Sequence, residues 1–188
     1  MKINYVTTNT LKFQIAKQYV DSIEGYELAQ RSLDVPEIQD ASCEVIASQS
    51  ALYAAKELGE PCVVMDLGFF IPALGGFPGP FVKYTNNWLS ESQLLRLLTE
   101  DDDRTAYFAD ALAIGFPDGT VEVFSHTTVG SLAREGEYTP SKWPANSLFI
   151  PLGHSRPLGQ LSEQEQTDFW HDENTIFAQL ITYLKNNA

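Results

Sequence analysis

The chain has 188 residues, the size of one ordinary domain, and its 44% hydrophobic and 20% charged residues are typical of a globular protein. No apolar run approaches the ~20 residues of a membrane helix, so we expect no membrane partner. Its 25 acidic against 12 basic residues, a net charge of −13, argue against polymeric nucleic acid as a partner, because cations that neutralise phosphates supply most of that affinity.

The N-terminus and the cysteines indicate the compartment. Residues 1–6 lead straight into a strand-like run and lack the apolar stretch of a signal peptide. Cys43 and Cys62 are too few for a disulfide framework and too far from other Cys or His residues for a zinc site. We therefore expect a cytoplasmic protein.

The first half of the chain alternates between predicted strands and helices. Strands are expected at 3–6, 26–33 and 62–65, and helices at 10–21 and 44–58. The second helix carries a face of alanines, and Gly59 and Pro61 end it. The run at 62–65 is wholly apolar and stops at Asp66, which is typical of a central strand covered on both faces.

The second half begins with a Gly- and Pro-rich segment at 75–80, followed by a helix through 94–98. Residues 104–116 and 121–127 predict a hairpin, with turn residues at 117–119. A loop is expected over about 135–156, and then one helix over 163–185 whose buried stripe is Phe169, Ile176, Phe177, Leu180 and Leu184. Together these elements predict an α/β fold with a mixed sheet, in a single domain over residues 1–188.

The first predicted helix opens on Thr7-Thr8-Asn9-Thr10-Leu11-Lys12, directly after the first strand. Free N–H groups at a helix N-terminus and the positive end of the helix dipole make this a candidate anion site. The ammonium of Lys12, in the first turn, is within reach of a bound phosphate. The alternative is that Thr8 or Asn9 only caps the helix.

Asp66 is predicted to lie at a strand end, where α/β sheets bind ligands. A carboxylate there is poorly solvated without a cation, which indicates a metal ligand or a functional base. The alternative is a structural carboxylate that accepts N–H bonds from a turn at residues 67–68. Glu37, Lys83 and His171, taken singly, read as a surface acid, a surface lysine and a helix histidine.

The order of the motifs is more specific than any one of them. Thr-x-Asn-x-x-Lys follows the first strand, Val-Pro-Glu-Ile-Gln follows the second, and the third ends in Asp before a Gly. Residues 73–83 read Ala-Leu-Gly-Gly-Phe-Pro-Gly-Pro-Phe-Val-Lys, and Asp-Arg-Thr-Ala-Tyr-Phe opens the hairpin. From Ile3 to about Leu184 the chain resembles the inosine triphosphate pyrophosphatase family, the non-canonical purine nucleotide pyrophosphatases.

The resemblance implies an elongated mixed β-sheet flanked by helices, two lobes with a central nucleotide cleft, and a homodimer. It also implies Mg²⁺-dependent hydrolysis of nucleoside triphosphates to the monophosphate and pyrophosphate, with deaminated purines favoured. Such a reaction needs positioning, charge neutralisation and an in-line water, and little covalent chemistry from the protein.

The resemblance also implies roles for individual residues. The phosphates would be held at the start of the first helix, by Thr7, Thr8, Asn9 and Lys12. The metal would be held by Glu37 and Asp66, and Asp66 would position the metal or activate the attacking water, with Lys12 as the second catalytic residue. Further substrate contacts are expected from Lys83, from Trp143 in the base-binding loop and from His171.

The chain departs from the family pattern mainly where the base is read. The third strand ends in Met65-Asp66-Leu67, where the family usually has two acids or an acid pair followed by a hydroxyl residue, and residues 48–50 lack the usual Lys. Residues 140–145 replace Gly-Phe-Gly-Tyr-Asp-Pro, and Gln166 and Asp172 stand where the family has Lys and Arg. An acid in place of an Arg presents an acceptor to a purine carbonyl instead of a donor, which predicts that ITP is not strongly preferred over ATP.

The leading hypothesis is therefore a Mg²⁺-dependent nucleoside triphosphate pyrophosphatase with altered or relaxed base specificity. One alternative is a catalytically weakened paralogue that binds a nucleotide or a protein partner, which Leu67, Gln166 and Asp172 favour. Another is a phosphohydrolase that acts on a different small phosphate ester at the same Mg²⁺ site.

Overall fold

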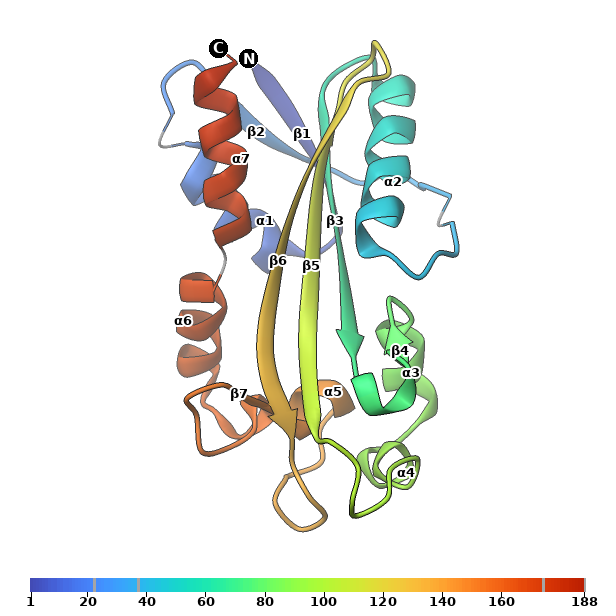
Figure 1. Cartoon of the computed structure of the whole chain (residues 1–188). Coiled ribbons are helices and arrows are strands. Elements are labelled where there is room, and N and C mark those ends of the chain that lie inside the picture. The colour runs from blue at the N-terminus through green and yellow to red at the C-terminus, as the bar shows by residue number, and fades with distance from the viewer. Residues whose placement is uncertain (22, 37, 174, 188) are drawn as a thin grey trace. The chain divides into compact units, whose positions relative to one another are not determined.

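The computed structural model describes residues 1–21, 23–36, 38–173 and 175–187, and the side chains at positions 11, 171–173 and 175 are likewise not described. The elements follow in this order (Figure 1): β1 (Lys2–Val6), α1 (Thr10–Val20), β2 (Glu27–Arg31), α2 (Cys43–Leu58), β3 (Cys62–Phe70), β4 (Pro78–Gly79), α3 (Val82–Trp88), α4 (Glu91–Leu95), β5 (Thr105–Gly115), β6 (Val121–Leu132), α5 (Pro144–Leu148), β7 (Phe149–Pro151), α6 (Glu163–Glu173) and α7 (Thr175–Asn186). Short 3₁₀ turns lie at Pro72–Leu74 and Leu158–Gln160.

The strands form a seven-stranded mixed sheet in the order β2-β1-β3-β5-β6-β7, with β4 paired to β3. The chain divides into two compact units. Unit 1 comprises Met1–Asp66, Asp110–His126 and Asn174–Ala188, and unit 2 comprises Leu67–Ala109 and Thr127–Glu173. These findings confirm the predicted α/β class, with its mixed sheet and two lobes. No helix in the described ranges has both the length and the apolar character that a membrane span requires.

Unit 1 contains the parallel part of the sheet. β1 pairs in parallel with β2 along its whole length, and with β3 through Tyr5↔Val63. This register puts Val6, the last residue of β1, level with Val64. β3 therefore continues beyond the carboxyl end of β1 from Met65 onward.

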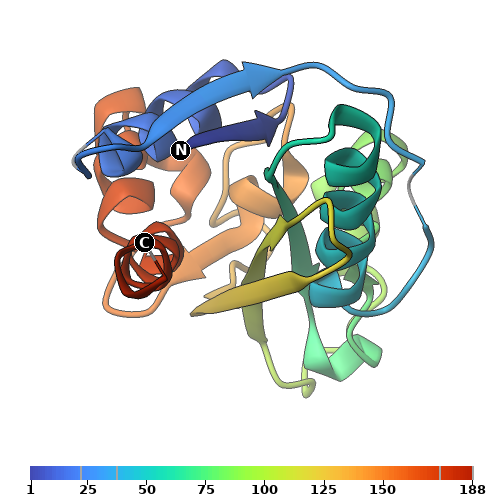
Figure 2. The ribbon, with the colours of Figure 1, turned by 90° about the horizontal axis from the view of Figure 1, so that it is seen from above.

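Helices cover both faces of the strands in unit 1. α1 and α7 contact each other (Figure 1), and their apolar side chains share one core with Tyr5 of β1 and with Leu112 and Ile114 of β5. α2 lies on the opposite side of β5 and β6 from α7 (Figure 2). A Cβ at Gly115 of β5 would lie 2.6 Å from the backbone of Ala51 of α2, so this strand and this helix approach each other closely because residue 115 has no side chain.

The core of unit 2 is rich in aromatic rings. The ring of Phe108 lies 4.7 Å from that of Phe69 and 4.9 Å from that of Phe149, measured between centroids. Trp170 of α6 packs edge-on against Phe108 at 5.5 Å. β7 pairs antiparallel with the last residues of β6, through Leu132↔Phe149 among others. These contacts attach α6 and β7 to the same core.

β3 is longer than the sequence pattern predicts. The apolar run predicts a strand that stops at Asp66, but β3 continues to Phe70, and Asp66 is the fifth of its nine residues. The strand continues because Phe69, three residues further on, is fully buried in the core of unit 2. Asp66 therefore marks the point where β3 passes from one unit to the other, and not the end of the strand.

The C-terminal region is helical on both sides of residue 174, which lies outside the described residues. The pattern predicts one helix over 163–185, and α6 (Glu163–Glu173) and α7 (Thr175–Asn186) occupy this range. The predicted apolar stripe serves two different cores. Phe169 packs against the core of unit 2, while Ile176, Phe177, Leu180 and Leu184 belong to that of unit 1.

Three other boundaries differ from the prediction. The helix expected through 94–98 is represented by two short helices, α3 and α4, and the second hairpin strand continues to Leu132. The loop expected over 135–156 contains α5 and β7. The turn of the hairpin is confirmed, because Gly119 has a positive φ of 89° and Asp118 accepts a hydrogen bond from the N–H of Thr120 at 2.9 Å.

Candidate functional site

The N-terminus of α1 is capped and open to solvent. The side-chain oxygen of Asn9 accepts a hydrogen bond from the backbone N–H of Lys12 at 3.1 Å, so the capping alternative is correct for Asn9. The backbone N–H of Asn9 in turn donates to Oγ1 of Thr7. Capping does not close the site, because Thr8, Asn9 and Thr10 are exposed.

Hydrogen bonds to β2 fix the turn between β1 and α1. The N–H of Thr7 donates to the carbonyl of Arg31 at 3.1 Å, and the side-chain amide of Gln30 donates to the carbonyl of Thr7 at 3.0 Å. The first-turn N–H groups of α1 therefore stand on a fixed backbone at the carboxyl end of β1. This arrangement can receive an anion.

Asp66 lies beyond the end of β1, on the face of the sheet that α2 covers. Val63 packs into the core shared with α1 and α7, and side chains alternate along a strand, so Asp66 points to the opposite face. There it takes part in a hydrogen bond with Cys43, the first residue of α2. No turn follows Asp66, because β3 continues through residues 67 and 68, so the alternative that depended on such a turn is wrong.

Cys43 is a protonated neighbour of Asp66. Burial raises the pKa of its thiol, and the negative charge of Asp66 and the hydrogen bond between the two residues raise it further. A thiol at a helix N-terminus is usually made more acidic, so burial and the carboxylate outweigh the helix here. With 2% of its surface exposed, Cys43 acts as a donor that orients Asp66 and not as a nucleophile.

One buried acidic side chain of unit 1, Asp110 of β5, is not identified by the sequence reasoning. Its side chain is only 5% exposed. Burial raises its pKa to about 6; Lys12 and His126 act to lower the pKa, and Asp66 raises it. The signal that identifies Asp66 was available here too, since Asp110 is the sole charged residue in the apolar strand Thr105–Gly115.

Of the two predicted metal ligands, only Asp66 lies among the described residues. Glu37 lies outside the described residues, and within the described part of the chain no group of three or more His, Cys, Asp or Glu side chains could hold a metal ion. Mg²⁺ is commonly bound through one or two carboxylates, with phosphate oxygens and waters completing the shell. The hard oxygen donor of Asp66 fits that chemistry, with the substrate supplying further ligands.

The other predicted substrate contacts belong to unit 2. Lys83 is exposed on α3, with its Nζ 5.9 Å from the centroid of the Tyr84 ring. Trp143 lies just before α5, is 48% exposed, and has the Nζ of Lys142 at 5.3 Å from its ring centroid. The backbone of His171 belongs to α6, but its side chain lies outside the described part of the structure.

Two residues of α6 near His171 have structural partners. The side-chain amide of Gln166 donates to the carbonyl of Leu161 at 2.9 Å. Trp170 packs against Phe169 and Phe108 in the core of unit 2. The side chain of Asp172, like that of His171, is not described.

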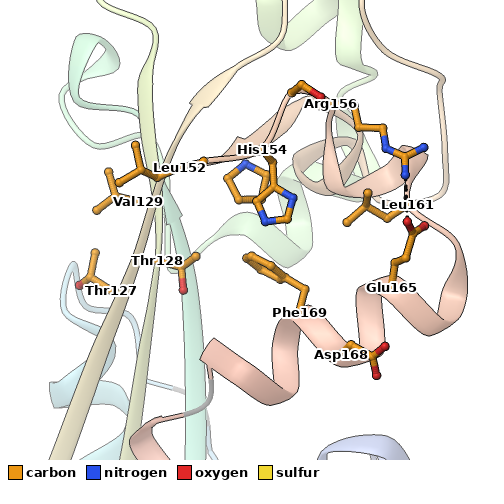
Figure 3. Close-up of a pocket in the computed structure, with 13 residues that line it drawn as sticks. Thr127, Thr128, Val129, Leu152, His154, Arg156, Leu161, Glu165, Asp168 and Phe169 are labelled. Carbon is orange, nitrogen blue, oxygen red and sulfur yellow. Dashed lines mark hydrogen bonds and ion pairs between the residues drawn. The ribbon is translucent and has the colours of Figure 1, made fainter.

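A cavity of about 750 Å³ lies within unit 2, between β6, the segment after β7 and α6 (Figure 3). The rings of His154 and Phe169 face each other edge-on inside it, with centroids 5.6 Å apart. Arg156 and Glu165 form an ion pair of 2.9 Å at its rim. Among the described side chains, none of those predicted to bind the substrate lines this cavity.

The sequence model of the Ham1 family matches residues 3–181. The chain belongs to the Ham1 family. This membership confirms the resemblance that the ordered motifs indicate.

Relatives and solved structures agree over nearly the whole of this Ham1-family chain. A dITP/XTP pyrophosphatase of Methanopyrus kandleri is 33% identical over 190 residues, covering 100% of this chain and 98% of the relative. One from Methanosarcina acetivorans is 35% identical over 175 residues, 93% of each chain. The Ham1 protein of Staphylococcus aureus has the same fold, with a TM-score of 0.81 at 24% identity and full coverage of both chains. The nucleoside-triphosphatase, or dITP/XTP pyrophosphatase, of Mycobacterium abscessus superposes with a TM-score of 0.77 at 26% identity, over 95% of this chain and 97% of that one.

Proposed function

We propose that this chain hydrolyses nucleoside triphosphates to the nucleoside monophosphate and pyrophosphate, with Mg²⁺ as its cofactor. Its relatives are named dITP/XTP pyrophosphatases, which are hydrolases of phosphoanhydride bonds. The observation that supports the proposal most is found in unit 1, where the exposed start of α1, with Lys12, and the carboxylate of Asp66 both follow the carboxyl end of β1.

Different residues of unit 1 have different roles in the proposed reaction. The hydroxyls of Thr7 and Thr8, the start of α1 after Asn9 and the ammonium of Lys12 bind the phosphates through O–H and N–H donors and positive charge. Asp66, held by the Cys43 thiol, accepts a proton from the attacking water or holds the metal. Glu37 is proposed as the second metal ligand. When bound, Mg²⁺ neutralises charge on the triphosphate and lowers the barrier to attack on phosphorus.

We further propose that base choice is altered or relaxed, with Lys83, Trp143 and His171 as the remaining substrate contacts. The side-chain amide of Gln166 is already bonded to Leu161, so it is engaged within the chain. Trp143 is half exposed and offers a stacking surface of the kind that accepts any base. Asp172, an acceptor, favours a base that presents an amino group.

Pyrophosphate release from canonical and deaminated nucleotides, measured with Mg²⁺, tests the function. We expect turnover of several triphosphates, with kcat/KM for ITP less than about 100-fold above that for ATP. Asp172→Arg should raise the ratio of kcat/KM for ITP to that for ATP by about 5- to 150-fold. This range corresponds to a free energy of about 1–3 kcal/mol for one buried polar contact.

Two variants test the site itself. Asp66→Asn should lower kcat by about 100-fold or more, which is typical of a lost general base. Asp101→Asn, an exposed acid of unit 2, should leave kcat unchanged. Full activity of the Asp66 variant would exclude the mechanism. Nucleotide binding without pyrophosphate release would favour the weakened paralogue.

Two broader properties belong with this proposal. We propose a homodimer, as the resemblance implies, and a cytoplasmic enzyme. Cys43 and Cys62 are both free and buried, which suits a reducing compartment.

A further inference from the structure

The short helix α5 of unit 2 starts on a residue that is unusual at a helix N-terminus. Trp143 occupies the N-cap position and Pro144 follows it as the first helical residue. N-cap residues are usually Ser, Thr, Asp or Asn, whose side-chain oxygen accepts a hydrogen bond from an N–H group of the first turn. An indole has a donor and no acceptor, so Trp143 cannot provide this bond. The first turn of α5 therefore needs an acceptor from elsewhere in the chain.

Asn86 of α3 provides that acceptor. Its Oδ1 accepts a hydrogen bond from the backbone N–H of Ala145 at 3.0 Å, from 59 residues earlier in the chain. Pro144 has no N–H, so Ala145 carries the first donor of α5. Ala145 is only 2% exposed, so without Asn86 a buried donor would be left unpaired. Asn86 thus caps α5 from another helix, which leaves the N-cap position to an aromatic residue.

The same hydrogen bond joins two elements that carry proposed substrate contacts. Lys83 lies three residues before Asn86 on α3, and residues at this spacing are neighbours on a helix surface. Trp143 lies two residues before Ala145, and its side chain is 48% exposed. α3 and α5 also contact each other. Asn86 therefore connects the helix that carries Lys83 with the backbone that carries the Trp143 ring.

Further hydrogen bonds hold the segment that leads into α5. The N–H of Ser141 donates to Oε1 of the buried Glu91 at 2.9 Å. The N–H of Trp143 donates to Oγ of Ser141 at 3.1 Å, and the hydroxyl oxygens of Ser141 and Ser147 are 2.7 Å apart. These bonds do not involve Asn86. We therefore expect the segment to stay folded when Asn86 is changed, with the loss confined to the first turn of α5.

We propose that Asn86 is a positioning residue for base recognition, whose bond to Ala145 holds the Trp143 ring in the orientation on which a nucleobase stacks. This inference rests on the proposed function, in which Trp143 contacts the substrate. A ring that is fixed before the base arrives loses less conformational freedom on binding, so the stacked base is held more tightly. Because the proposed chemistry takes place at the phosphates, Asn86 should act on KM and not on kcat.

Steady-state kinetics with ATP and Mg²⁺ test the proposal through a double-mutant cycle. Asn86→Leu, which is similar in size but has no acceptor, should raise KM by about fivefold or more and leave kcat within about twofold of wild type. In a Trp143→Ala background the same substitution should change KM by less than about twofold, since the ring that it orients is gone. An equal rise of KM in both backgrounds would overturn the proposal, as would an unchanged KM in Asn86→Leu.

Two variants on α3 provide the controls. Asn86→Asp keeps an acceptor oxygen at the same place, so KM should stay within about twofold of wild type. Asn87→Leu makes the same change as Asn86→Leu at the next, exposed position, and KM should again stay within about twofold. A rise of KM in either control equal to that of Asn86→Leu would show that the hydrogen bond to Ala145 is not the cause, and the proposal would fail.

A second measurement needs no turnover, so it separates this inference from the proposed function. The chain has three tryptophans, Trp88, Trp143 and Trp170, so fluorine NMR of the fluorotryptophan-labelled protein gives three signals, which Trp→Phe variants assign. In Asn86→Leu the Trp143 signal should shift by more than its linewidth or broaden by about twofold or more, because the ring samples several orientations. The signal of Trp170, which packs against the core of unit 2, should not change. An unchanged Trp143 signal would exclude the positioning role even in a protein that hydrolyses no nucleotide.

Discussion

At the scale of single residues, Asp110 links stability to pH. Its pKa is raised from 3.8 to about 6, chiefly by burial. Between these values the folded state binds more protons than the unfolded state, so this group lowers the free energy of unfolding as the pH rises. Above pH 6 its unfavourable contribution is complete, at about 1–3 kcal/mol.

The prediction is that Asp110→Asn is more stable than wild type at pH 7.5, by about 1–3 kcal/mol, and that the advantage fades between pH 6 and 4. Urea unfolding of both proteins across this range, without Mg²⁺, measures the difference. Taking the difference is necessary because exposed acids such as Asp118, whose pKa is lowered by hydrogen bonds from Thr120, change stability in the opposite direction in both proteins. A constant difference from pH 4 to 7.5 would contradict the prediction.

Asp66 and Asp110 also show what a sequence can reveal about a site. Asp66 was predictable because one carboxylate stands out after an apolar run. Asp110 carries the same signal. It lies inside a strand of the predicted hairpin, however, and a ligand site is expected at strand ends. The hydrogen bond between Cys43 and Asp66 was not predictable, because it joins α2 to β3 across more than twenty residues of chain.

At the scale of elements, the start of α1 is both a structural cap and the proposed phosphate site. Asn9→Ala removes the acceptor for the N–H of Lys12, which should cost about 1 kcal/mol of stability. It should also raise KM for the nucleotide severalfold, since the turn that presents the N–H donors loses its order. Thermal unfolding and steady-state kinetics check the two effects.

Ser90→Ala is the matched control for this prediction. Ser90 caps α4 in unit 2, where its hydroxyl accepts from the N–H of Gln93 at 3.4 Å. The stability loss should be similar, but KM should not change. If KM rises equally in both variants, the start of α1 does not hold the phosphates.

Local sequence predicts the existence of elements better than their extent. The parallel strands, α1 and α2 follow from periodicity and from stop signals such as Gly59, which has a positive φ of 65°. The length of β3 does not, because it depends on which core receives each side chain. Phe169 and Ile176 fit one helical stripe in the sequence, although they pack into different cores.

At the scale of the whole molecule, the net charge of −13 opposes the approach of a triphosphate. Raising the ionic strength from 10 to 150 mM shortens the screening length from about 30 to about 8 Å. At fixed free Mg²⁺, kcat/KM should therefore rise by about twofold or more with added KCl. The usual fall with salt would show instead that Lys12 and its neighbours outweigh the global field.

The close approach of α2 and β5 limits the substitutions that this sequence can accept without unfolding. Ala47, Ala51, Ala54 and Ala55 are all fully buried, and Gly115 leaves no room for even one methyl group against Ala51. A core of leucines can change in both directions, losing or gaining volume, but alanine and glycine have almost no volume to lose. Nearly every substitution at these five positions therefore adds volume to a contact that is already filled. In a saturation library selected for folded protein, these positions should be the most restricted of unit 1, and their variants should be rescued by a second change that moves the helix and not by a smaller neighbour.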